Sequence, residues 1–198
     1  MSMRGKYTEP SSKLHYFLVE WDPRMLSWEE FRGKVLGATD PATAVKGSVR
    51  REIYDDWKKL GLSAQPDVGD NGERATVWAL LRACSLPAPC LLLACSWRPT
   101  RRPSPCSPTS LVFPPGVHAS ASPFEALAER VNWTGADVTR DNFGRGLLAA
   151  GIPPATVTSW FQDPQVPFEG KKQSLFDLLE DIDSGDCIAK AQLIAGIQ

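Results

Sequence analysis

The segment from residue 73 to residue 116 differs so strongly in composition from the rest of the chain that it divides the sequence into two parts. It contains four of the five cysteines and eight of the 17 prolines, and it lacks Lys, Asp, Asn, Gln, Ile, Tyr and His, which the flanking parts use freely. Five arginines and a single acidic residue give it a positive charge, whereas the whole chain has a net charge of −1. We therefore expect residues 73–116 to form a low-order insert.

Three interpretations of this segment compete. A disulfide or zinc framework is disfavoured because the cysteine spacings of six, five and eleven residues match no zinc pattern and no histidine accompanies them. A membrane-inserting hairpin is disfavoured because Arg82, Pro87 and Pro89 interrupt the apolar run 75–95. We favour the third interpretation, that the segment is translated non-coding sequence. A codon for Gly72 can contain the start of an intron, and codons for Pro115-Gly116 can contain its end, in the same reading phase.

Composition and length exclude several classes of protein. A chain of 198 residues is long enough for one ordinary domain with a small addition. A net charge of −1 argues against a general nucleic-acid binder, which needs a clustered basic face. No apolar run approaches the roughly 20 residues of a membrane span, and the polar residues 1–13 lack the apolar centre of a secretory signal. We expect a cytoplasmic protein with no membrane or nucleic-acid partner and with residues 1–13 disordered.

Local patterns predict a strand and three helices in the parts that flank the segment. A β-rich run followed by Asp22-Pro23 predicts the strand. Ser27-Trp28-Glu29-Glu30 is a capping-box signature, and Ser122-Pro123 is a typical helix start. The expected elements are a strand over 14–21 and helices over 28–36, 48–60 and 123–132.

After residue 132 the pattern changes to short helices, which predicts a helical C-terminal extension over residues 133–198. The expected helices cover 143–150, 154–161, 174–183 and 186–195. Cys187 falls on a helical apolar face and is expected to be a buried thiol. The acidic residues between 180 and 186 lack the spacing of a calcium loop, so we predict no metal site.

Two blocks of sequence contain candidate functional residues. With residues 73–116 bridged, Asn71-Gly72 is followed by Val117-His118-Ala119-Ser120-Ala121-Ser122 and a helix. This order resembles the active-site segment of the nucleoside diphosphate kinase family, Asn-x-x-His-Gly-Ser-Asp-Ser. Gly37-Ala38-Thr39-Asp40-Pro41 and Gly47-Ser48-Val49-Arg50 resemble the family block Gly-x-Thr-Asn-Pro … Gly-Thr-Ile-Arg.

The resemblance implies an α/β fold with a ferredoxin-like nucleoside diphosphate kinase-type sheet over residues 14–132, truncated at its N-terminus. It implies transfer of a γ-phosphate from a nucleoside triphosphate to a nucleoside diphosphate through a phosphohistidine, with Mg²⁺ on the nucleotide and assembly into a homo-oligomer. The residues it assigns are His118 as nucleophile, Glu129 as the carboxylate that orients it, Ser120 as an assisting hydroxyl, and Thr39, Arg50 and Asn71 as nucleotide-binding residues.

Elementary chemistry agrees with these roles. A histidine with a pKa of about 6.5 is largely neutral and nucleophilic at neutral pH, and a carboxylate on one ring nitrogen leaves the other for attack. The sequence also departs from the family, since Ala119 replaces its Gly, Ala121 replaces its Asp, and Gly33 stands where its second Arg is expected. The family's first strand with its lysine has no counterpart. The alternative function is therefore a catalytically inactive interaction or scaffold protein with the same fold.

Overall fold

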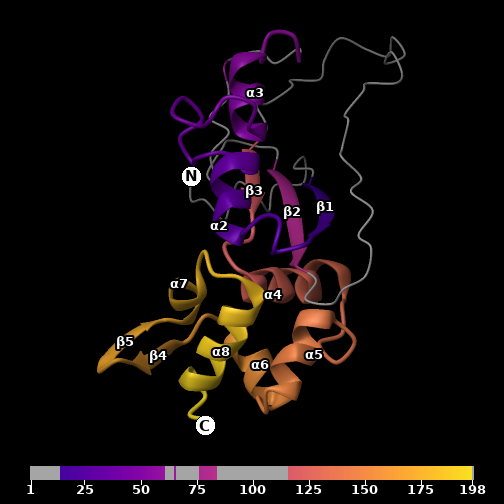
Figure 1. The fold of residues 1–198 in the computed structure, drawn as a ribbon. Helices are drawn as coiled ribbons and strands as arrows, with labels where there is room; N and C mark the ends of the chain where they lie inside the picture. Colours follow the sequence, from indigo (N-terminus) through magenta and orange to yellow (C-terminus); the bar gives the residue numbers. More distant parts are fainter. Residues whose placement is uncertain (1–13, 61–64, 66–75, 84–115, 198) are drawn as a thin grey trace, which may run out of the picture.

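A computed structural model describes residues 14–60, 65, 76–83 and 116–197, and Figure 1 shows their arrangement. Within these residues the fold is mixed α/β, with a three-stranded sheet, a two-stranded sheet, seven α-helices and one π-helix. The prediction of an α/β protein is confirmed at this level. The N-terminus expected to be disordered, residues 1–13, and the candidate residue Asn71 lie outside the described residues.

The larger sheet is parallel and consists of β1 (Leu14–Trp21), β2 (Thr76–Ala83) and β3 (Gly116–Ala119), in that order. The predicted strand over 14–21 is confirmed. The expectation of low order throughout 73–116 is wrong for residues 76–83, which form the middle strand. Thr, Val and Trp at the start of this stretch favour a strand, and β2 has a hydrogen-bonding neighbour on each side.

Three helical elements follow β1: α2 (Trp28–Glu30), η1 (Phe31–Leu36) and α3 (Val49–Asp55). The predicted capping box is confirmed, since Ser27 Oγ accepts a hydrogen bond from the Glu30 amide and Glu30 Oε2 accepts one from the Ser27 amide, at 3.1 and 3.3 Å. The helix continues to Leu36 as a wider π-helix. It ends at Gly37, whose φ of 100° a residue with a side chain rarely adopts. Helix α3 is shorter than the predicted range 48–60.

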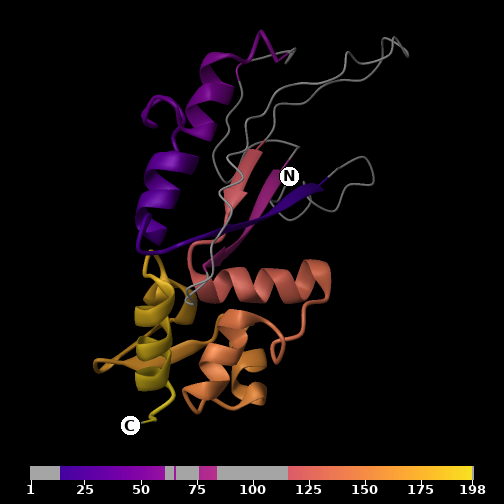
Figure 2. The same cartoon turned by 45° about the vertical axis from the view of Figure 1, so that its right-hand side comes forward.

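Helix α4 (Pro123–Thr134) lies between the three-stranded sheet and the C-terminal elements in Figures 1 and 2. Ser122 Oγ accepts a hydrogen bond from the Glu125 amide at 3.0 Å, and Pro123 occupies the first turn, so the predicted helix start is confirmed. Gly135, with a φ of 68°, ends the helix in the left-handed conformation.

The C-terminal extension is not entirely helical. Residues 165–174 form an antiparallel hairpin whose turn contains Glu169 and Gly170, both with positive φ. The sequence pattern missed this hairpin because its strands have four residues each and one contains Pro167. The elements are α5 (Asn142–Ala149), α6 (Pro154–Trp160), β4 (Gln165–Phe168), β5 (Lys171–Ser174), α7 (Leu175–Leu179) and α8 (Ser184–Ile194). No helix in the described part of the chain has the length and apolar character needed to cross a membrane.

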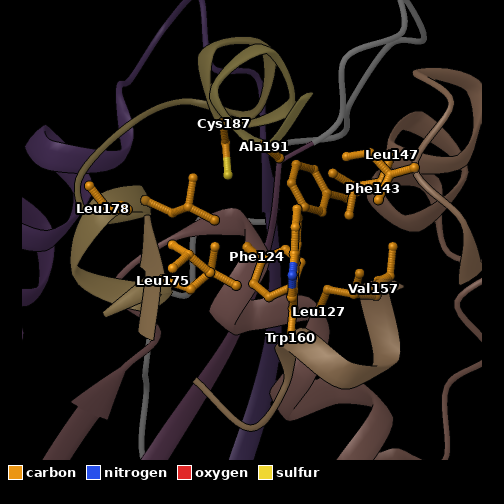
Figure 3. Close-up of a cluster of buried hydrophobic side chains, with 13 residues drawn as sticks. Phe124, Leu127, Phe143, Leu147, Val157, Trp160, Leu175, Leu178, Cys187 and Ala191 are labelled. Carbon is orange, nitrogen blue, oxygen red and sulfur yellow. The ribbon is translucent and has the colours of Figure 1, made fainter. Parts of the chain in front are cut away.

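Two apolar clusters fix the position of α4. The larger cluster joins Phe124 and Leu127 of α4 to buried side chains of the C-terminal elements, among them Leu147, Trp160 and Cys187 (Figure 3). The prediction that Cys187 is buried is confirmed. Full burial of one such Leu or Phe side chain contributes about 1.5–3 kcal/mol to folding. The C-terminal extension therefore shares its core with the helix that follows β3.

The smaller cluster joins β1, α2, η1, β3 and α4. Its centre is aromatic: the ring of Trp21 stacks on Phe31 with centroids 4.6 Å apart, and the ring of Trp28 lies 5.0 Å from Trp21. Val117 and Ala119, the residues on either side of His118, are both buried in this cluster. Because His118 points to the opposite face of the strand from its two neighbours, their burial fixes the direction of its side chain.

Candidate functional site

His118 of β3 and Glu129 of α4 are in hydrogen-bond contact. Their Nε2 and Oε1 atoms are 2.9 Å apart, and the two side chains are only 19% and 11% exposed. The short connection between β3 and α4 makes this contact possible, because Ser122 starts the helix immediately beyond the strand and Glu129 lies in its second turn. A carboxylate accepts hydrogen bonds and cannot donate them, so the proton of the pair lies on Nε2.

Ser120 binds the other oxygen of the same carboxylate. Its hydroxyl donates to Glu129 Oε2, and its side chain is fully buried. The carbonyl oxygen of Ser120 accepts a hydrogen bond from the indole nitrogen of the buried Trp28 at 3.1 Å. The structure thus brings together three of the predicted site residues, His118 on β3, Ser120 after it and Glu129 on α4, and Trp28 of the aromatic cluster binds the main chain between the two elements.

Glu125 belongs to this group although the sequence analysis did not select it. It precedes Glu129 by four residues and so lies on the same face of α4, and its Oε2 accepts a hydrogen bond from the Ala121 amide. A carboxylate therefore contacts the main chain at the position where the kinase family has an aspartate side chain. The Glu-x-x-x-Glu spacing after His118 was the signal that could have identified it.

The pKa of the Glu125 carboxyl is raised above its ordinary value of 4.5. Burial is the main cause, because it disfavours the charged form, and the negative charge of Glu129 adds to it. The hydrogen bond from the Ala121 amide acts in the opposite direction, as do the charge of Arg32 and the charge that His118 carries when it is protonated, but they do not cancel the increase. The neutral form of Glu125 is thus favoured more in the folded protein than it is in water.

Arg50 is buried and contacts main-chain carbonyl groups. Its guanidinium donates to the Gly37 carbonyl at 2.8 Å and to the Val117 carbonyl at 2.9 and 3.3 Å, and the residue is 4% exposed. These hydrogen bonds tie β3, next to His118, to the turn that ends η1. The family resemblance implies that Arg50 binds the nucleotide, whereas in the structure these contacts support the strand that carries His118.

Two predicted residues remain. Thr39 is exposed in the segment that connects η1 to α3, and Asn71 lies outside the described residues. The C-terminal extension contributes contacts that the sequence did not indicate. The amide of Asp181 donates to the Ala121 carbonyl at 3.0 Å, and Asp183 Oδ1 accepts from the Trp28 amide at 2.8 Å. The α7–α8 connection therefore braces the loop after His118.

A cavity of about 430 Å³ lies beside the two carboxylates. Glu125 and Glu129 line one side of it, and Phe161 and Phe176 from the C-terminal extension contribute aromatic rings. Both rings pack against the buried Phe124, with centroids 5.7 and 6.1 Å from it. The cavity gives a route from solvent to the acidic face of α4.

The sequence matches no protein-family model, no curated protein and no solved structure.

Proposed function

We propose that the chain is a nucleoside diphosphate kinase-type phosphotransferase that acts through a phosphorylated His118. The contact that carries this proposal is the 2.9 Å hydrogen bond between His118 Nε2 and Glu129 Oε1, with Ser120 on the second oxygen of the carboxylate. A histidine, a carboxylate that orients it and a third group that orients the carboxylate form the arrangement expected of an activated nucleophile.

The hydrogen bond determines which ring nitrogen reacts. With the proton on Nε2, the lone pair lies on Nδ1, which attacks the γ-phosphorus of a magnesium nucleoside triphosphate. The Nδ1–P bond forms as the bond from phosphorus to the bridging oxygen breaks, and the diphosphate leaves with that electron pair. Glu129 stabilises the positive charge that develops on the ring. An incoming diphosphate then attacks the phosphohistidine, and the reverse steps regenerate neutral His118.

The ferredoxin-like sheet of the kinase family is part of the same proposal. A split β-α-β unit, in which two parallel strands are separated by the width of one strand, is characteristic of that fold. Strands β1 and β3 are parallel to each other and have one strand between them, but this middle strand is parallel to both, whereas the middle strand of a split unit in a ferredoxin-like sheet is antiparallel to its neighbours. The described sheet therefore does not support this part of the proposal, which depends on the family resemblance alone. In this chain the middle position is taken by β2 from residues 76–83.

The test is incubation of the full chain with γ-³²P-labelled ATP and Mg²⁺, followed by denaturing electrophoresis at alkaline pH. We expect a label that is stable to base and labile to acid, absent from His118→Gln and present in His15→Gln, a control that changes the only other histidine. Addition of unlabelled nucleoside diphosphate should move the label into the triphosphate. Retention of the label by His118→Gln, or no label on folded wild-type protein, would overturn the proposal.

The second candidate is a catalytically inactive interaction or scaffold protein of the same fold. The observation in its favour is the set of Arg50 contacts, because a guanidinium bound to the Gly37 and Val117 carbonyls has fewer N–H groups left for phosphate. This candidate predicts native circular dichroism and no labelled histidine under any nucleotide condition. The labelling experiment therefore decides between the two.

A further inference from the structure

Three potential metal ligands from β3 and α4 lie together. One ligand atom from each of His118, Glu125 and Glu129 can be chosen so that all three atoms lie within 4.8 Å of one another, and each residue is partly buried. Zn–N and Zn–O bonds of about 2.0–2.2 Å place ligand atoms roughly 3–4 Å apart. The three ligand atoms therefore lie close to the spacing that a zinc site requires.

The two carboxylates are oriented by hydrogen bonds from outside the three ligands. The Ser120 hydroxyl donates to Glu129 Oε2, and the Ala121 amide donates to Glu125 Oε2. In metal sites, ligating carboxylates are characteristically held in this way by second-layer hydrogen bonds, which fix their orientation before the ion arrives. Each glutamate is thus anchored through one oxygen and can bind an ion through the other.

The negative charge of the two carboxylates and their access from solvent also favour the binding of a cation. The two carboxylates are neighbours on one face of α4, and their like charges repel in a partly buried setting. Arg32, whose positive charge acts on Glu125, forms ion pairs with Glu180 and Asp181. The cavity lined by Glu125 and Glu129 provides the entry path that a metal site requires.

We propose that His118, Glu125 and Glu129 bind a divalent transition-metal ion of the Zn²⁺ type and that the bound ion blocks the reaction of His118. One imidazole nitrogen with two carboxylate oxygens is a ligand set that suits Zn²⁺ and Co²⁺. Mg²⁺ prefers six oxygen ligands in an octahedron and keeps several waters, so it fits this set poorly. The Mg²⁺ of the nucleotide substrate therefore does not compete for the site.

The bound ion prevents the reaction of His118 because it changes the tautomer of the imidazole ring. An ion on Nε2 displaces the proton that Glu129 accepts in the metal-free state, and this proton moves through solvent to Nδ1. Nδ1 then carries N–H in place of the lone pair that attacks phosphorus. Metal binding and phosphorylation are mutually exclusive states of one ring. The inhibitory part of this inference rests on the proposed function, whereas the metal binding does not.

The test uses Co²⁺ as a spectroscopic probe on the reduced full chain after removal of metals with a chelating resin. We expect one equivalent of Co²⁺ to give visible absorption without the near-ultraviolet charge-transfer band of a cobalt–thiolate bond, which excludes the cysteines as ligands. Zn²⁺ should displace the Co²⁺, and millimolar Mg²⁺ should not. Glu125→Gln should weaken Zn²⁺ binding at least tenfold, whereas Glu52→Gln, a change at an exposed acid on α3, should leave it unchanged.

The outcomes separate the metal site from the proposed function. Equal Zn²⁺ affinity of Glu125→Gln and wild type, or a spectrum of the thiolate type, would overturn the metal site. If the site exists and the proposed function is right, one equivalent of Zn²⁺ prevents labelling of wild-type His118, and this inhibition is lost in Glu125→Gln. If Co²⁺ binds as expected but no variant ever forms phosphohistidine, the metal site stands and the proposed function is wrong.

Discussion

Replacement of Glu129 by Gln tests the role of the carboxylate most sharply. The amide has the same length and can place its oxygen against His118 Nε2 and its nitrogen against Ser120, so the change removes the negative charge but keeps the shape. A hydrogen bond to a charged group contributes about 1.5–3 kcal/mol, and 1.36 kcal/mol corresponds to a factor of ten in rate. Because both His118 and Glu129 are at least four-fifths buried, solvent screens this interaction little. We expect His118 to be phosphorylated about 10- to 150-fold more slowly.

The assay is rapid-quench labelling with γ-³²P-labelled ATP at neutral pH, with Glu52→Gln as the matched control at an exposed position. Thermal unfolding and circular dichroism establish that both variants are folded. Glu129→Asp adds a second comparison, because it keeps the charge but withdraws the carboxylate by one methylene group. A labelling rate of Glu129→Gln within twofold of wild type would refute the role assigned to the carboxylate.

Three further predictions concern stability and reactivity. Arg50→Met leaves the Gly37 and Val117 carbonyls without their donor. The free energy of unfolding, measured in urea, should therefore fall by about 1–3 kcal/mol for each of the two carbonyl groups. Glu125→Gln removes an acid whose pKa is raised by folding; it should therefore stabilise the protein at pH 7 to 8 and have no effect below about pH 4, as thermal unfolding at several pH values would show. Burial raises the pKa of the Cys187 thiol to about 12, so this cysteine should resist iodoacetamide at pH 8 until the protein unfolds, as residue-resolved mass spectrometry would detect.

Each of these predictions has a contrary result. Arg51→Lys, which changes an exposed ion pair on α3, is the control for Arg50→Met, and equal stability of the two variants would contradict the support role. The sign for Glu125 follows from linkage: in the range between the unfolded and the raised folded pKa, the folded protein binds more protons, so stability decreases as pH rises. A lower stability of Glu125→Gln than of wild type at pH 8 would contradict the predicted stabilisation. Rapid alkylation of Cys187 in the folded protein would contradict its burial.

The elements that sequence predicted correctly depend on local signals. The strand over 14–21 follows from its β-rich residues, and the helix that starts at Pro123 follows from the Ser122 cap. The contact between His118 and Glu129 was also accessible, because a strand, a short turn and a capped helix fix the relation between residues eleven apart. The roles that the family resemblance gives to these residues stay predictions until phosphohistidine is measured.

The features that sequence did not predict depend on partners far away in the chain. Strand β2 pairs with residues more than 30 positions away on both sides, and composition alone suggested that its segment was foreign. The burial of Arg50 is visible only when Gly37 and Val117 are placed beside it. The tryptic peptide 75–82, recovered from the native protein, would establish that β2 is translated. Its consistent absence, together with a transcript that joins Gly72 to Val117, would support the non-coding interpretation.

The position of the phosphoryl group on His118 tests the central claim most directly. Glu129 holds Nε2, so the reaction is assigned to Nδ1. The phosphoprotein formed from a magnesium nucleoside triphosphate should therefore give the ³¹P and ¹⁵N nuclear magnetic resonance signals of Nδ1-phosphohistidine at His118, and these signals should disappear when a nucleoside diphosphate is added. Phosphorylation at Nε2, or a folded protein that shows no phosphohistidine at all, would contradict the account.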